Sequence, residues 1–325
     1  MNQFKVKRYQ TQDFELWNAF VSKAKNGTFL FHRDFMEYHK DRFNDYSLLV
    51  FKKDKLIALL PANHKDGVLY SHQGLTYGGL LVDSKTKFQV VFDIFKELLE
   101  YLALEGVSTL NLKLLPSIYS ALPNDELLYL MFLLNANLYR RDALSVINLN
   151  SPIKFSKSRI EGCKRAKKHE LIIKEVDTFE AFWNIILIPN LSKKHKASPV
   201  HSLEEIRFLK SKFPKNIRQF NVYQGQHIVA GTTVFETDNV VHSQYISGNN
   251  LKNELGSLDA LHAYLIETVF KDKLYFDFGT SNENEGRQIN GGLQFWKEGF
   301  GARTIIQDFY TLETKTFKAL EDVFI

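Results

Sequence analysis

The feature that most constrains the fold of this chain is an internal repeat. The segment LIALLPANHKDGVLYS begins at Leu56, and the segment IVAGTTVFETDNVVHS begins 172 positions later, at Ile228. The two segments align without a gap, so that Ala58 coincides with Ala230. Each follows a short polar turn with an apolar strand on its far side. Each repeat therefore predicts a meander of antiparallel strands.

The two halves continue in the same order after the meander. Apolar residues recur at helical spacing in FQVVFDIFKELLEYLALEG and again in SLDALHAYLIETVF. Each predicted helix leads to a buried strand (TLNLKLL or LYFDFG), a second helix (around 126–134 or 292–298) and a closing strand (LSVINL or TIIQDFYTL). The segments FKVKRYQTQDFELW and LIIKEVDTFEAFW open the halves as a strand and a helix.

This order predicts an α/β fold of two tandem domains, each with a mixed α+β sheet flanked by helices. We expect an N-terminal repeat over 1–150, a basic linker helix over 151–170 and a C-terminal domain over 171–325. A length of 325 residues, 44% of them hydrophobic, is enough to form two cores.

The composition also excludes some classes of protein. The N-terminal MNQFKVKRYQTQDF lacks the apolar segment of a signal peptide, and no run approaches eighteen apolar residues. We therefore expect a cytoplasmic protein without a membrane span. Cys163 is the single cysteine, which excludes an intrachain disulfide and a cysteine-based zinc site. The motifs GxxxxGK[ST], HExxH and GxSxG are absent from the sequence, which fits a metal-free transferase.

Several motifs of the second half resemble those of the Fem family of peptidoglycan-bridge aminoacyltransferases and their tandem-GNAT relatives. YFDFGTS and the later GLQFWKEGFGA are similar to the family's aspartate-containing strand, its aromatic–lysine pair and its phenylalanine–glycine. GCKRAKKHEL resembles the basic helix that enters the family's second domain, and ASPVHSLEEIRFLKSKFP resembles the helical segment before its meander. The first half matches by architecture alone. The resemblance implies a duplicated GNAT fold, with the active site in the C-terminal domain and direct transfer of an acyl group to an amine.

Three residues are expected to be catalytic. The resemblance places Lys297 near the reacting carbonyl, where a fixed cation stabilises the oxyanion, although spacing alone predicts an exposed surface lysine. Asp277 lies on an otherwise apolar strand. It predicts either a carboxylate that positions substrate or accepts a proton, or one that holds the following loop through backbone N–H groups. Tyr245 lies on the meander strand that would face the cleft.

The carrier of the acyl group needs a site for its phosphates, and a helix N-terminus supplies one. Asn253, Gly256 and Ser257 occupy the position of the family's pyrophosphate-binding turn, before an amphipathic helix. The resemblance therefore implies an acyl-CoA donor such as acetyl-CoA. The match is partial, because coenzyme A binders in this fold usually show an Arg or Gln and two spaced glycines. The alternative is a simple helix N-cap.

Further residues are expected to bind substrate. Alternation along the meander strand places His242 and Gln244 on one face and Tyr245 on the other, unless a β-bulge intervenes. His201 precedes a predicted helix, where it could lie above the cleft or cap the helix. We also assign substrate contacts to Trp296, Ser281 and Asn282.

A basic segment runs from Lys157 to Lys168, with Glu161 as its one acidic residue. It could contact the phosphates of a transfer RNA or of a nucleotide-linked substrate, or it could be a solvated helix face. Its cations would favour the thiolate of Cys163.

Three functions fit these features. The first is N-acyl transfer from acyl-CoA to an amine of a sugar, peptide or cell-envelope precursor. The second is Fem-like transfer from aminoacyl-tRNA to a nucleotide-linked peptidoglycan precursor. The third is a non-catalytic module of the same fold, in which Lys297 would point away from the cleft.

Overall fold

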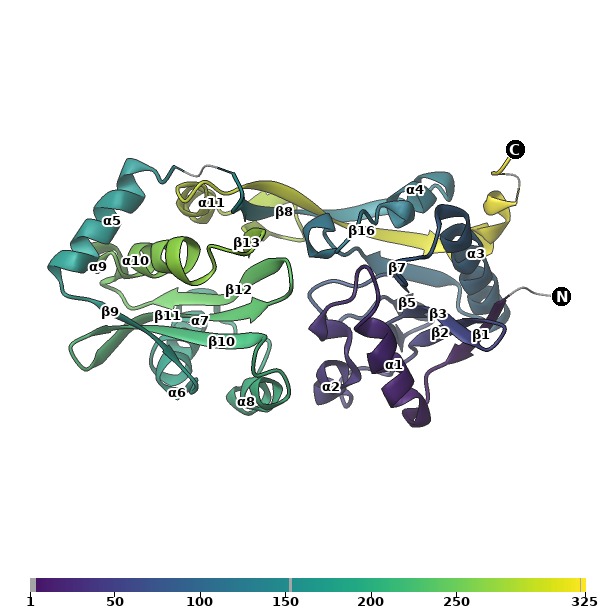
Figure 1. Cartoon of the computed structure of the whole chain (residues 1–325), viewed down its shortest axis with the longest axis horizontal. Coiled ribbons are helices and arrows are strands. Elements are labelled where there is room, and N and C mark those ends of the chain that lie inside the picture. Colours follow the sequence, from purple (N-terminus) through teal and green to yellow (C-terminus); the bar gives the residue numbers. More distant parts are fainter. Residues whose placement is uncertain (1–3, 152–153, 322) are drawn as a thin grey trace. The chain divides into compact units, whose positions relative to one another are not determined.

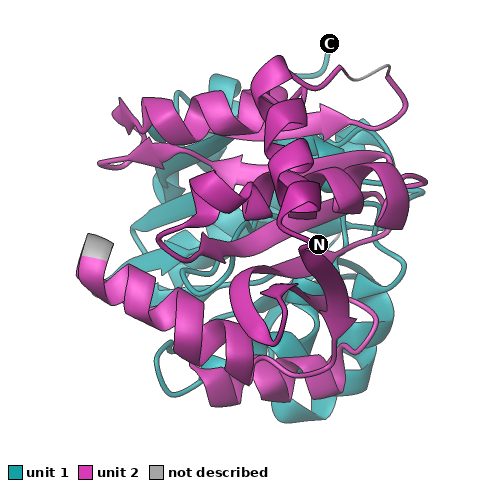
Figure 2. Ribbon diagram, turned by 90° about the vertical axis from the view of Figure 1, so that its left-hand side faces the viewer, with its two compact units in different colours: residues 1–142, 306–325 teal, residues 143–305 magenta. Residues whose placement is uncertain are grey.

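The computed structural model describes residues 4–151, 154–321 and 323–325 and divides the chain into two compact units. Unit 1 comprises residues 1–142 and 306–325, and unit 2 comprises residues 143–305 (Figure 2). The division differs from the predicted boundaries at 150 and 170, because the last twenty residues belong with the first unit. Part of the predicted linker, residues 152 and 153, lies outside the described residues.

Among the residues described, unit 1 contains strands of two sheets and four α-helices (Figure 1). One sheet has the order β1-β2-β3-β6, and the other includes β4-β5-β7-β16. The strands are β1 (Phe4–Arg8), β2 (Leu48–Lys52), β3 (Lys55–Leu60), β4 (Asn63–Lys65), β5 (Val68–Tyr70), β6 (Leu81–Val82), β7 (Thr109–Lys113) and β16 (Arg303–Glu313). The helices are α1 (Phe14–Val21), α2 (Arg33–Met36), α3 (Phe88–Leu104) and α4 (Glu126–Leu133).

Unit 2 is built on a sheet with the order β8-β13-β12-β11-β10-β9. Its strands are β8 (Asn137–Asn148), β9 (Ile172–Val176), β10 (Ile217–Gln224), β11 (His227–Glu236), β12 (Val240–Gly248) and β13 (Tyr275–Thr280), with the hairpin β14 (Asn282–Glu283) and β15 (Gln288–Ile289) beside it. The helices are α5 (Lys157–Lys168), α6 (Glu180–Phe182), α7 (Ile188–His195), α8 (Leu203–Lys212), α9 (Lys252–Leu255), α10 (Ser257–Tyr264) and α11 (Gly291–Glu298). In Figure 1, α10 lies on one side of β11 and β12, and α6 lies on the other. The predicted fold class, mixed sheets flanked by helices, is confirmed.

The sequence repeat also appears in the strand pairing. The register between β2 and β3 shifts between Val50 and Phe51, and the register between β10 and β11 shifts between Val222 and Tyr223. The two irregularities are 172 residues apart, which is the offset of the sequence repeat. Each unit also contains one parallel pair of strands, β5 with β7 and β12 with β13. A one-residue irregularity at equivalent positions supports duplication of a single ancestral unit.

The closing strands are exchanged between the repeats, which corrects the prediction that each half closes on its own strand. LSVINL, at the end of the first repeat, lies in β8, and this part of β8 pairs with β13 of unit 2. TIIQDFYTL, at the end of the second repeat, lies in β16, which pairs with β7 of unit 1. The chain therefore crosses between the units twice, once within β8 and once within β16.

Each unit has a hydrophobic core of its own. In unit 1, α3 packs its buried face, which includes Phe95 and Leu98, against strands of both sheets. In unit 2, α10 covers the sheet face that carries Val234, Val241 and Phe276. No helix formed by residues 4–151, 154–321 and 323–325 has the length and hydropathy required to cross a bilayer.

Candidate active site

The candidate site of unit 2 lies where two parallel strands stop pairing. Strands β12 and β13 pair over three positions, of which the last is His242 with Asp277. Strand β12 continues to Gly248 and β13 to Thr280, but their ladder does not continue. Side chains at this point lie at the carboxyl ends of parallel strands, a common location for ligands in open α/β sheets.

A β-bulge in β12 brings His242 and Tyr245 to one face. Tyr245 pairs with Thr233 of β11, while Ser243 pairs with the next residue, Val234, so that Gln244 is the extra residue. Cross-strand partners share a face, and His242 pairs with Phe235, two residues from Thr233. The β-bulge is therefore present, and His242 and Tyr245 lie on the same face of the sheet, which strict alternation would not allow.

His242 and Asp277 form a hydrogen-bonded pair. The Nδ1 atom of His242 lies 3.0 Å from Oδ2 of Asp277. The other carboxylate oxygen, Oδ1, accepts a hydrogen bond of 2.7 Å from the backbone N–H of Gly279. Asp277 thus has the loop-holding role considered for it, because it accepts from a backbone N–H group of the following turn, and it also orients His242. A carboxylate on Nδ1 favours the tautomer whose Nε2 is free to accept a proton.

Lys297 is buried beside this pair, with 2% of its surface exposed. Its Nζ donates to the carbonyl oxygens of Gly279 (2.9 Å) and Thr280 (2.7 Å). The lysine projects from α11, whose N-terminus is capped by the side chain of Asn290. Burial lowers the pKa of Lys297 to about 8, and the charge of Asp277 partly opposes this shift. The surface position expected from spacing alone is wrong, because the lysine turns inward to the end of β13.

Tyr245 and His201 form a second buried pair on the same face as His242. The Tyr245 hydroxyl lies 2.6 Å from Nδ1 of His201 and accepts a 3.3 Å hydrogen bond from the His201 backbone N–H. Burial raises the pKa of Tyr245 to about 12, so that the hydroxyl stays protonated at neutral pH. His201 does not cap α8, since the cap is Ser202, whose side chain accepts from the backbone N–H of Glu205.

The predicted pyrophosphate-binding turn lies on the opposite side of the sheet, between α9 and α10. Ser257 is the first residue of α10 and has no exposed surface. Helix α5 covers the turn, because a Cβ atom added to Gly256 would lie 2.0 Å from the carbonyl oxygen of Gly162 in α5. Arg165 of α5 donates to the carbonyl oxygen of Asn253. Asn253, Gly256 and Ser257 therefore belong to the surface on which α5 packs.

The remaining predicted residues surround α11. Asn282 uses its side chain within the loop, where Oδ1 accepts from the backbone N–H of Ala143 (2.7 Å) and Nδ2 donates to Gly286. Ser281 is buried at the end of β13, and its Oγ has no hydrogen-bond partner among the described residues. Trp296 donates from Nε1 to Asp259 of α10 (2.9 Å). Asp259 carries no distinctive signal in the sequence, because an aspartate in the first turn of a helix is ordinary.

The basic segment divides its charges between two sides of α5. Arg159 and Arg165 turn inward to Asp259. The exposed residues include four lysines: Lys157, Lys164, Lys167 and Lys168. Burial raises the pKa of Cys163, and the neighbouring Asp259 raises it further. The expectation of a favoured thiolate is therefore wrong, because the carboxylate and burial outweigh the nearby cations.

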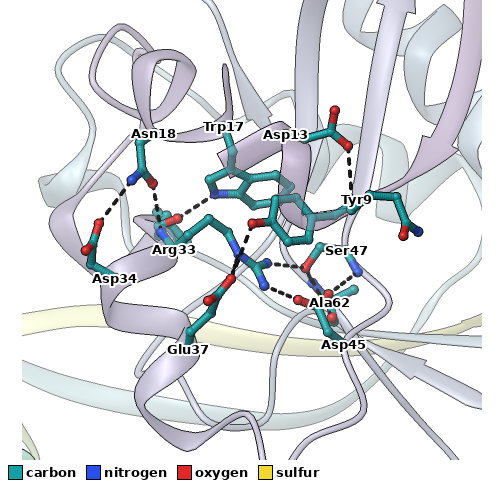
Figure 3. A network of polar contacts seen from close by, with 12 residues as sticks. Tyr9, Asp13, Trp17, Asn18, Arg33, Asp34, Glu37, Asp45, Ser47 and Ala62 are labelled. Atoms are coloured by element: carbon teal, nitrogen blue, oxygen red, sulfur yellow. Dashed lines mark hydrogen bonds and ion pairs between the residues drawn. The ribbon is translucent and has the colours of Figure 1, made fainter. Parts of the chain in front are cut away.

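A dense polar network in unit 1 centres on Arg33 (Figure 3). Its guanidinium is paired with Glu37 (3.0 Å) and Asp45 and lies 3.8 Å from the centroid of the Tyr9 ring. Burial raises the pKa of Tyr9 to about 12. This network joins the residue after β1, helix α2 and the segment before β2. Within the described part of the chain, no group of His, Cys, Asp and Glu could hold a metal ion.

Comparisons with known proteins agree with this architecture. No protein-family model matches the sequence, and no curated protein matches it significantly. Among solved structures, that of FemX superposes with a TM-score of 0.65 at 10% identity, covering 94% of this chain and 96% of that one. The structure of L-PGS from Bacillus licheniformis gives a TM-score of 0.58 at 12% identity, covering 94% and 92%.

A tandem GNAT protein from the clavulanic acid biosynthesis pathway gives a TM-score of 0.50 at 12% identity, covering 96% of this chain and 98% of that one. At these identities the similarity concerns the fold, and it extends over nearly the whole length of each chain. This protein therefore has the tandem GNAT-like fold that FemX also has, as the motifs of its second half predicted.

Proposed function

We propose that the protein is an N-acyltransferase whose reacting centre is His242, Asp277 and Lys297 of unit 2. The observation that carries the proposal is the pair of His242 and Asp277 at the end of the parallel strands, beside a buried lysine. This arrangement provides a base and a cation within one water-poor site. The tandem GNAT-like fold, which the motif resemblance associates with direct transfer of an acyl group to an amine, supports the assignment.

In the proposed reaction, the acceptor amine attacks the carbonyl carbon of the donor. His242 accepts a proton from the amine at Nε2, and Asp277 stabilises the resulting imidazolium through Nδ1. The negative charge that develops on the carbonyl oxygen is stabilised by Lys297. An ammonium has three N–H donors, two of which are directed at Gly279 and Thr280. The third is available for the oxyanion, which gains more from it in a buried site than in water.

The leaving group takes up the proton when the tetrahedral intermediate collapses. Tyr245, whose hydroxyl stays protonated, lies on the same face and is the candidate donor of that proton. The proton held by the His242 imidazolium then returns to the Tyr245 phenolate through solvent, which restores both residues. The non-catalytic alternative expected Lys297 to point away from the cleft. Its inward position favours an enzyme.

The position of α5 over this turn helps to distinguish between the two possible acyl donors. The turn at Gly256 would bind the pyrophosphate of coenzyme A only if α5 moved, since Gly162 lies against it. The same helix exposes four lysines that could bind RNA phosphates. These two observations favour an aminoacyl ester of RNA over an acyl-CoA thioester as donor, with an amine of a nucleotide-linked or cell-envelope precursor as acceptor. Acetyl-CoA remains the second candidate, because the tandem GNAT-like fold is compatible with it.

The first experiment compares the two donors directly. Purified protein is incubated with radiolabelled aminoacyl-tRNA or radiolabelled acetyl-CoA and a panel of amines that includes amino sugars and nucleotide-linked peptides. We expect transfer from aminoacyl-tRNA that depends on His242. Transfer from acetyl-CoA, together with calorimetric binding in the micromolar range, about −8 kcal/mol, would reverse the choice of donor. Transfer from neither donor, with no binding of either, would contradict an acyltransferase function.

A further inference from the structure

Asp259 of α10 joins three helices of unit 2 and is buried. Its Oδ1 accepts hydrogen bonds from Nη1 of Arg159 in α5 and from Nε1 of Trp296 in α11. Its Oδ2 lies 3.8 Å from Nη2 of Arg165. One carboxylate thus links the basic helix to the helix that carries Lys297.

The chain is adapted to this contact at two glycines. A Cβ atom added to Gly162 would lie 1.8 Å from Oδ2 of Asp259, so any other residue there would require the carboxylate or α5 to shift. Gly256 adopts a φ of +66° and lies against the backbone of Gly162. Two close approaches between α5 and the start of α10 fix where the basic helix sits.

Trp296 connects the contact between α5 and Asp259 to the candidate site, because it is the residue before Lys297. Its ring packs edge-on against His262 (centroids 5.0 Å apart), Phe300 (5.1 Å) and Phe278 (5.5 Å). Phe278 belongs to β13, and the next two residues provide the carbonyl oxygens that hold the Lys297 ammonium. A shift of the indole would therefore move both the Lys297 ammonium, which donates these hydrogen bonds, and the carbonyl oxygens that accept them.

We propose that Asp259 is a positioning residue, which holds Trp296 and thereby keeps Lys297 in its buried position while it secures the basic helix α5. The inference rests on the proposed function insofar as it concerns catalysis. The position of Lys297 itself can be tested without any substrate.

The test measures how readily Lys297 is protonated when its support is removed. Trace acetic anhydride labels neutral amines, and peptide mass spectrometry reads the pH midpoint for Lys297 in the full chain. The wild-type midpoint should lie near 8, because burial disfavours the ammonium. In Asp259→Ala and in Trp296→Phe water reaches the amine, and the midpoint should rise by about one pH unit toward the ordinary value of lysine. The pH at which the transfer rate falls on the alkaline side of its pH–rate profile (the alkaline limb) should rise together with this midpoint.

Glu236→Gln is the matched control, because Glu236 is also a carboxylate between two cations in unit 2, Arg218 (2.9 Å) and Lys273 (3.0 Å). This variant should leave the midpoint unchanged. Partial unfolding would add a labelled fraction without moving the midpoint of the folded protein. Where Asp259→Ala does not fold, Trp296→Phe decides, since it keeps an aromatic ring while it removes the N–H donor and part of the volume of the indole.

An unchanged midpoint in the folded Asp259→Ala and Trp296→Phe variants would overturn the proposal, as would an equal shift in Glu236→Gln. A shifted midpoint in a protein without transferase activity would support the role of Asp259 while it contradicts the proposed function. A shifted midpoint with an unshifted alkaline limb would leave Asp259 as the support of Lys297 and overturn its role in catalysis.

Discussion

The two units differ at the point where their parallel strands stop pairing. In unit 2 the last pair is His242 with Asp277, and in unit 1 it is Tyr70 with Asn111. Each unit also holds a lysine near this point. Lys297 of unit 2 is buried, whereas Lys113 of unit 1 is half-buried and donates to the carbonyl oxygen of Leu75 (2.6 Å). Burial lowers the pKa of both Lys113 and Lys297 to about 8.

The two copies thus share a scaffold, but the histidine–aspartate pair occurs in one of them, and their lysines come from different elements, since Lys113 lies in β7 and Lys297 in α11. A tyrosine and an amide do not exchange protons near neutral pH. Among the described residues of unit 1, the counterpart of β12 is short, because β5 ends at Tyr70 and the loop with HQGLTYGG follows. The side chain of Asn63 holds that loop by accepting from the backbone N–H of Gln73.

The largest expected effect tests this asymmetry. His242→Gln removes the base, and we expect kcat to fall by about 10²- to 10⁴-fold. Tyr70→Phe, at the equivalent position of unit 1, should change kcat by less than about threefold, since general acid–base catalysis does not involve it. Steady-state transfer assays on both variants measure this. Equal losses would mean that both units take part in the chemistry.

A second comparison concerns the two lysines. Lys297→Met removes the cation that stabilises the oxyanion, and kcat should fall by about 10²- to 10³-fold, whereas Lys113→Met should leave it within a few-fold. In the wild type, the rate should fall as the pH rises through about 8, because neutral lysine does not stabilise an oxyanion. A pH–rate profile with no decline near this value would argue against the role of Lys297.

The Arg33 network should affect stability and leave the chemistry intact. Arg33→Ala leaves the carboxylates of Glu37 and Asp45 without their cation, and we expect the free energy of unfolding to fall by about 3 kcal/mol. Urea unfolding measures this loss, and kcat of the folded fraction should be unchanged. A large fall in kcat at full folding would place the network in the catalytic machinery.

The smallest expected effect concerns the pH dependence of the free energy of unfolding, to which one lysine of each unit contributes. The folded-state pKa values of Lys113 and Lys297 lie below the unfolded value of about 10.4. Between these values the unfolded chain binds more protons, so stability should rise as the pH increases from about 8 to about 10. Replacing either lysine by Met should reduce this rise by about 1–3 kcal/mol, measured by urea unfolding at both pH values. A rise that is the same in both variants and the wild type would show that neither lysine is buried as an ammonium.

Much of the architecture follows from local sequence patterns. The repeat, the meanders, the long helix of each half and the strand carrying Asp277 were predicted because hydrophobic periodicity and turns are short-range signals. The exchange of β8 and β16 was not predicted, since the choice between two similar partner strands depends on long-range pairing. The β-bulge at Gln244 could not be predicted from the sequence of β12 alone, because a bulge is a register shift relative to the partner strand. Whether His242 and Tyr245 share a face therefore stayed conditional on it.

The sequence by itself determined two similar mixed-sheet domains and the residue types available for chemistry: a histidine, an aspartate and a lysine in the second half. The tertiary structure decided which of these meet. It paired His242 with Asp277, turned Lys297 inward and placed α5 over the turn at Gly256. The physical reason is that each of these contacts joins segments far apart in the chain, where packing and desolvation, and not local propensity, set the position and the pKa of a side chain.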